Sequence, residues 1–159
     1  MRLLAATTLA LLASALPAAA ANVDFTGIVV AGCSITASTN GTLGLNLTTG
    51  TTLGSEEVGG LPGSVTVLSI GGSTLTIGAP TRTSTAPSGY VTGTELVEVS
   101  YSGASGLSGI SQAYTSSQTT QSLGTIAASV LTINNRITNS NGFPAATYTT
   151  RTVVTCAQP

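Results

Sequence analysis

Apolar and polar residues alternate with a period of two in several stretches of the chain, whereas the period of an amphipathic helix is not repeated. Such alternation is typical of strands that bury one face, because successive side chains point to opposite faces. It predicts that Val65 and Val67 share a face, as do Leu75 and Ile77. The expected strands cover residues 23–36, 43–47, 64–70, 73–79, 94–103, 130–137 and 147–156.

Turn-forming residues separate these runs. Gly, Asn and Pro, which supply the backbone angles of tight connections, gather at residues 38–42, 59–64, 70–73, 86–90 and 139–144. Short strands at this spacing, with almost no candidate for a long helix, predict an all-β sandwich.

For two of the expected strands, the sequence predicts which side chains share a face. In residues 94–103, Val97, Val99 and Tyr101 share one face. We expect Glu95 and Glu98 to form a solvated strand face, because a metal site would need more oxygen ligands than these two provide. In residues 43–47, the three leucines are expected to share one face.

The N-terminal residues have the parts of a secretory signal peptide. Met1-Arg2 is followed by an apolar run and then by alanines at positions 18–21. Polar residues and Pro17 interrupt the run, which argues against a membrane helix of about 20 apolar residues. We therefore expect a signal peptide over residues 1–21, a single domain over residues 22–159, and export to the periplasm or cell surface of a bacterium. No other segment is expected to span a bilayer as a helix.

Charge is scarce in this chain. Charged residues make up 6% of it and the net charge is −1, whereas about 25% charged residues is usual. This composition argues against nucleic acid or anionic lipid as partners. It does not indicate disorder, because the chain is apolar and uncharged.

The sequence offers few groups for chemistry. It contains no histidine and no lysine, so the usual general bases and nucleophile partners are missing. Glu56 and Glu57 are adjacent in a glycine-rich loop and do not form a pair across a cleft. We therefore expect no catalytic residue, metal or cofactor. Tyr90 and Tyr114, next to expected loops, are the candidates for stacking on a ligand.

Two cysteines stand near the ends of the chain. In an oxidising compartment Cys33 and Cys156 are expected to form a disulfide, the alternatives being intermolecular pairing and free thiols. A bond between them requires the first and last strands to come within about 7 Å between Cα atoms.

The two ends also resemble a known family. "VDFTGIVVAGCSIT" resembles the first strand of bacterial pilins assembled by the chaperone and usher route, and "GFPAATYTTRTVVT" resembles their last strand and the ending of the spore coat protein U group. The resemblance implies an immunoglobulin-like (pilin-like) β-sandwich, here of about seven to nine strands, that lacks its final strand and is completed by strand donation. It implies a disulfide role for Cys33. It further implies that a neighbour's strand is received by the edge made of Tyr148, Thr150, Thr152 and Val154.

The implied partners are other copies of the chain or sibling surface subunits, together with a periplasmic chaperone and an outer-membrane usher. Two features depart from the family pattern. Only about two residues separate the expected cleavage site from Val23, whereas a donating extension has a dozen or more, and the disulfide partner is Cys156 rather than a residue of the second strand. These departures favour a pilin-like surface protein over an ordinary polymerising shaft subunit.

The expected function is therefore that of a structural or adhesive subunit of a fimbria-like or coat-like surface assembly, held through strand edges. The alternative is a self-contained secreted binding module for a glycan or host protein. An unpaired apolar groove beside the last strand favours the first function. Tyr90 and Tyr114 side by side in a concave patch favour the second.

Overall fold

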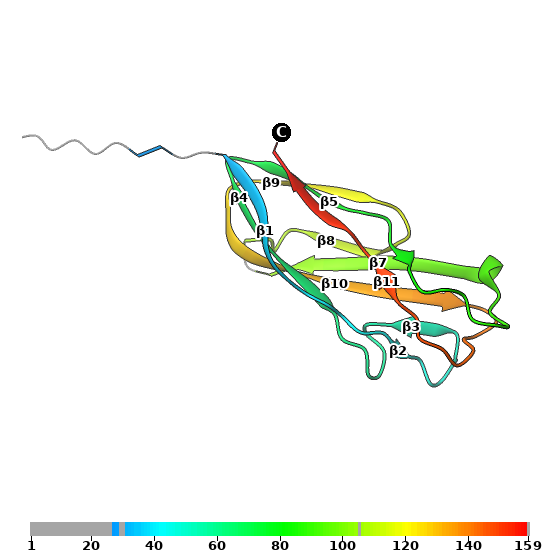
Figure 1. Cartoon of the computed structure of the whole chain (residues 1–159). Helices are drawn as coiled ribbons and strands as arrows, with labels where there is room; N and C mark the ends of the chain where they lie inside the picture. Colours follow the sequence, from blue (N-terminus) through cyan, green and yellow to red (C-terminus); the bar gives the residue numbers. More distant parts are fainter. Residues whose placement is uncertain (1–26, 29–30, 105, 159) are drawn as a thin grey trace, which may run out of the picture.

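The structure, a computed structural model, describes residues 27–28, 31–104 and 106–158, and these form an all-β fold (Figure 1). Its strands are β1 (Gly32–Thr39), β2 (Gly44–Leu45), β3 (Thr52–Gly54), β4 (Gly63–Ile70), β5 (Ser73–Ile77), β6 (Thr81–Arg82), β7 (Glu95–Gly103), β8 (Ser111–Thr115), β9 (Thr119–Leu123), β10 (Ile126–Asn139), β11 (Thr150–Arg151) and β12 (Val154–Ala157). A short 3-10 turn, η1 (Thr92–Thr94), precedes β7. Within the described ranges, no helix is long and apolar enough to cross a membrane.

The largest sheet is antiparallel and curls around its long central strand, β10. On one side, β10 pairs with β4 through residues 126–133 and with β3 through residues 136–138, and β1 and β2 complete this side. On the other side, β10 pairs with β7 through residues 131–139, and β8 lies beyond β7.

Two smaller sheets share the C-terminal segment of the chain. One has the order β12-β5-β9, and the other pairs β11 with β6. Between them, the amide of Gly78 donates to the carbonyl oxygen of Val153 at 2.8 Å, and beyond β11 the amide of Thr83 donates to Thr149 at 2.8 Å. Residues 149–157 therefore follow the segment from β5 to β6 along one backbone edge.

The hydrophobic core is shared between the largest sheet and the three-stranded sheet. The hydroxyl of buried Tyr101 on β7 hydrogen-bonds to Thr119 at 2.8 Å and accepts from Gln121 at 3.0 Å, both on β9 of the other sheet, so this buried polar group is satisfied. The buried cluster consists of Val65, Val67, Leu75, Ile77, Val99, Tyr101, Leu107, Leu123, Ile126 and Leu131.

Four of the expected strands are confirmed. The strands β4, β5, β7 and β10 correspond to the runs at 64–70, 73–79, 94–103 and 130–137, although β5 ends at Ile77 and β7 begins at Glu95. In β4 and β5 every second residue is buried, including the expected pairs Val65 with Val67 and Leu75 with Ile77. The period-two pattern predicted these strands because each buries one face against the shared core.

The first strand begins later than expected. Strand β1 starts at Gly32, and residues 27–28 and 31 belong to no strand. The remaining part of the expected run, residues 23–26 and 29–30, lies outside the described residues. The pairing of Gly32 with Ile70, the last residue of β4, sets the beginning of the ladder.

The expected strand at 43–47 is wrong beyond its first residues. Only Gly44 and Leu45 form a strand, and the side-chain carbonyl of Asn46 accepts hydrogen bonds from the amides of Thr48 and Thr49, both at 3.0 Å. This turn leaves Leu47 79% exposed. The side-chain competition of Asn with the backbone therefore ends the strand before the third leucine.

The two glutamates of β7 are not a solvated face. The side chain of Glu95 is 14% exposed and pairs with Arg82 at 2.7 Å, and that of Glu98 is 12% exposed and pairs with Arg136 at 2.8 Å. The register of the sheet explains the second pair, because Arg136 on β10 lies directly opposite Glu98. The expectation failed because neither arginine is a sequence neighbour of its glutamate.

Candidate functional site

A disulfide links the two strands that border the candidate site. Cys33 on β1 is bonded to Cys156 on β12, with 5.7 Å between the Cα atoms, which confirms the expected pairing. The bond therefore joins the largest sheet to the three-stranded sheet. An additional strand between two others would hold them roughly 9.5 Å apart, so no strand fits between β1 and β12 at this point.

Beyond the disulfide, β1 and the C-terminal segment border a groove with a volume of about 880 Å³. Within the described residues, no ladder joins β1 to residues 148–154, although both line this groove. One end lies near Ile35 and Val154, beyond which the disulfide ties β1 to β12, and the other end lies near Asn40 and Tyr148.

The floor of the groove is apolar. It includes Ile35 of β1, Val65 of β4, Ile133 of β10 and Val154 of β12. Val65 belongs to the buried core, and the other three are partly buried and pack against it. The groove is thus a place where the hydrophobic core reaches the surface between two strands.

The wall formed by the C-terminal segment is held in place from two sides. The side chain of Asn135 on β10 donates to the Thr150 hydroxyl at 3.0 Å and accepts from the Thr152 hydroxyl at 2.8 Å. Backbone pairing with β5 and β6 fixes the outer side of the same segment. The backbone edge that faces the groove has no ladder partner among the described residues.

All four residues expected at a receiving edge line this groove. Tyr148, Thr150, Thr152 and Val154 are half-buried, and the residues between them are exposed, so the alternation expected for this run is confirmed. The strand itself is interrupted at residues 152–153, between β11 and β12.

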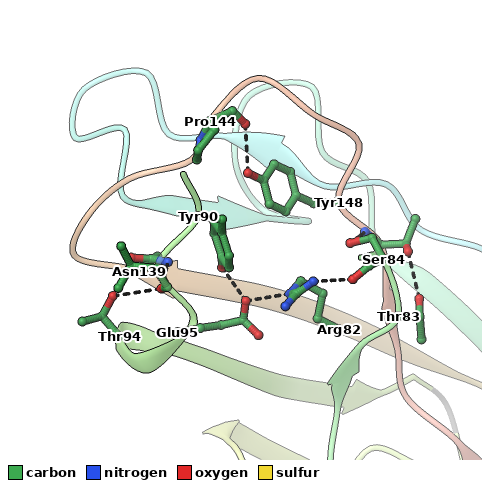
Figure 2. A network of polar contacts seen from close by, with 11 residues as sticks. Arg82, Thr83, Ser84, Tyr90, Thr94, Glu95, Asn139, Pro144 and Tyr148 are labelled. Atoms are coloured by element: carbon green, nitrogen blue, oxygen red, sulfur yellow. Dashed lines mark hydrogen bonds and ion pairs between the residues drawn. The ribbon is translucent and has the colours of Figure 1, made fainter. Parts of the chain in front are cut away.

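Tyr90, Phe143 and Tyr148 form an aromatic cluster at this second end of the groove, and Figure 2 shows Tyr90 and Tyr148. The ring of Tyr148 lies 5.5 Å from that of Tyr90 and 5.2 Å from that of Phe143, measured between centroids. The Tyr148 hydroxyl donates to the carbonyl oxygen of Pro144 at 2.9 Å. Burial raises the pKa values of Tyr148 and Tyr90, so both hydroxyls stay protonated as donors.

A partly buried ion pair lies next to this cluster. Arg82 donates through Nε to Glu95 and through a terminal guanidinium nitrogen to the carbonyl oxygen of Ser84, and Tyr90 donates to the same carboxylate of Glu95 (Figure 2). The guanidinium also lies 5.2 Å from the centre of the Tyr90 ring. These contacts give Tyr90 a packing role at this end of the domain.

Tyr114 belongs to a separate cluster. Its hydroxyl donates to Glu56 at 2.8 Å, and the guanidinium of Arg136 lies 3.9 Å from its ring centre. Burial, and then the hydrogen bond to Glu56, raise the pKa of Tyr114 to about 12. No aromatic contact joins Tyr114 to Tyr90 in the part of the chain that the structure describes.

Arg151 is a feature of the groove that the alternation pattern did not single out. Its side chain is exposed, and it is the one charged residue among the described residues that line the groove. Arg82 and Arg136 form ion pairs, whereas no ion pair of Arg151 occurs among the described residues. The described residues also contain no group of three or more potential metal ligands of the His, Cys, Asp and Glu types.

No protein-family model, curated protein or solved structure matches this chain.

Proposed function

We propose that the chain is an exported structural or adhesive subunit of a fimbria-like or coat-like bacterial surface assembly, and that it associates through β-strand edges. The observation that carries the proposal is the apolar groove between β1 and the C-terminal segment. Addition of a strand to an open edge needs free backbone groups for affinity and pockets for alternate side chains. The free edge of residues 148–154 and the floor around Ile133 supply both.

The size of the groove suits one short strand. The segment from Tyr148 to Val154 contains seven residues, which at about 3.3 Å per residue is roughly 23 Å of extended chain. Such a strand would direct three or four side chains to the apolar floor. In this proposal the sheets form an immunoglobulin-like, pilin-like sandwich, whose eight strands of four or more residues are β1, β4, β5, β7, β8, β9, β10 and β12.

We propose that the occupant is residues 22–31 of a second copy. With cleavage after Ala21, ten residues precede β1, because β1 begins at Gly32 rather than at Val23. In this segment Val23, Phe25 and Val29 share one parity, as a strand with one apolar face requires. Ile28, one of its described residues, is 87% exposed, and residues 27–28 extend away from the domain in Figure 1.

The proposal places the chain outside the cytoplasm, with sibling subunits as partners and with a periplasmic chaperone and outer-membrane usher as assembly factors. The low charge of the groove supports association by strand pairing, since charged side chains on an edge normally prevent it.

The test is the mass in solution of the mature protein, exported to an oxidising periplasm and measured by light scattering after size exclusion. A ladder of oligomers is expected. Phe25→Asp should abolish the ladder, because it puts a charge on the apolar face of the segment. Thr26→Asp introduces the same charge on the opposite face and should leave the ladder intact.

The end-to-end disulfide favours one second candidate, a self-contained binding module for a glycan or host protein. In that case the mature protein would be a stable monomer at every concentration, and Phe25→Asp would not change its mass. The same measurement therefore separates the two candidates.

A further inference from the structure

Arg151 and Asp24 suggest how the inserted strand is aligned. Arg151 is exposed on the wall of the groove, and Asp24 is the only aspartate of the chain and the only ionisable side chain of residues 22–31. The two opposite charges thus belong to the two surfaces that strand addition would bring together. The inference rests on the proposed function and adds a register and a direction to it.

The direction follows from the closed end of the groove. At Cys33 and Cys156 the Cα atoms are 5.7 Å apart, so an inserted strand has to end before this point. The acceptor's own residues 27–28 also leave the domain beside this end (Figure 1). The donor's domain, which follows residue 31, therefore fits at the open end, and the donor's first residues lie towards the disulfide.

An inserted strand with this direction runs antiparallel to residues 148–154, because those residues run towards Cys156. Residues directly opposite each other in antiparallel strands point to the same face. Thr150 and Tyr148 point inwards and Arg151 points outwards, as their burial alternates. Phe25 and Gly27 must therefore lie opposite inward residues, and Asp24 opposite an outward one.

We infer that Asp24 of one copy pairs with Arg151 of the next and thereby selects a single register for the inserted strand. In this register Phe25 lies opposite Thr150, and Gly27 lies opposite Tyr148. The smallest residue of the donor then faces the bulkiest residue of the wall, an agreement that does not depend on charge. A slip of two residues keeps the apolar face inside but loses both matches, and a slip of one residue turns the apolar face outwards.

A charge-reversal cycle tests the pair in the full mature chain. Asp24→Arg and Arg151→Asp should each weaken association by about five-fold, as expected for loss of an exposed ion pair and the gain of a like-charge contact. The double variant should return to within about two-fold of the unmodified protein. Thr120→Asp, a new charge at an exposed position of β9, is the control and should have no effect.

Cross-linking tests the register independently of the strength of association. Asp24→Cys combined with Arg151→Cys should give interchain disulfide ladders on a non-reducing gel. Asp24→Cys combined with Val153→Cys, two residues out of register on the same face, should give few. Three results would overturn the inference. They are a stronger ladder from the pair of residues 24 and 153, an intrachain bond in a monomer, and no recovery of association in the charge-swapped double variant. If the register is overturned but the unmodified protein still forms oligomer ladders, the proposed function stands. A strictly monomeric unmodified protein overturns both the register and the proposed function.

Discussion

Removal of the Cys33–Cys156 bond is expected to lower the free energy of unfolding by about 5 kcal/mol. The bond spans a sequence separation of 123 residues. For a loop of that length, the chain-entropy relation gives about 5 kcal/mol at 25 °C, because the unfolded chain loses that much freedom when its ends are joined. Domains are stable by only about 5–15 kcal/mol in total, so this single bond accounts for a large part of the stability.

The perturbation is the double variant Cys33→Ser with Cys156→Ser, which leaves no unpaired thiol. Urea unfolding can be followed by the fluorescence of the four tyrosines, since the chain has no tryptophan. With a slope of about 2 kcal/mol per molar urea, the midpoint should fall by about 2.5 M. Thr155→Ser, next to the bond, is the control and should not move it. A loss below about 1 kcal/mol would refute the argument that the bond acts by restricting the unfolded chain.

Two further outcomes follow from the core and from Tyr114. Leu131→Ala should lower the free energy of unfolding by about 2–5 kcal/mol, because Leu131 is fully buried on the central strand. Val130→Ala, at a position 41% exposed, should lower it by less than about 0.5 kcal/mol. The urea midpoints of the two variants measure the difference. The pKa of Tyr114, raised to about 12 from 10.0, contributes stability that is fully present below pH 10 and is lost as the pH rises towards 12, because the unfolded chain releases this proton first. Tyrosinate absorbance should therefore show a titration near pH 12 that Tyr114→Phe abolishes, and an unchanged titration curve in that variant would contradict the assignment.

The strands that the sequence predicted are those whose two faces differ in polarity. In β5, Leu75 and Ile77 alternate with threonine and are buried, and in the first half of β4 Val65 and Val67 are buried in the same way. In the second half of β4 the buried position is Ser69. The strands β8 and β9 have no such contrast, because "SQAYT" and "TTQSL" are mostly polar. These two are edge strands, each paired on one side only, and an edge buries too little apolar surface to leave a pattern.

The candidate site was predictable in part for a similar reason. The family resemblance of the last strand indicated the four side chains that line the groove, and the alternation of residues 147–156 placed them on one face, because sharing a face is a property of one strand. The floor was not predicted, since it brings together Ile35, Val65 and Ile133 from three strands that are distant in sequence. The tether of Asn135 to Thr150 and Thr152 likewise depends on how two sheets pack, which no local pattern contains.

The disulfide and the groove are two consequences of one arrangement. A domain that leaves an edge unpaired between its first and last strands gives up the backbone hydrogen bonds that would otherwise hold its two ends together. The Cys33–Cys156 bond holds the ends at one point instead, and the ladders with β4 and β5 hold the two strands on their outer sides. The groove can therefore stay open along the rest of its length. In the assembly that we propose, the disulfide would keep the two ends of the domain together before the neighbouring strand is added.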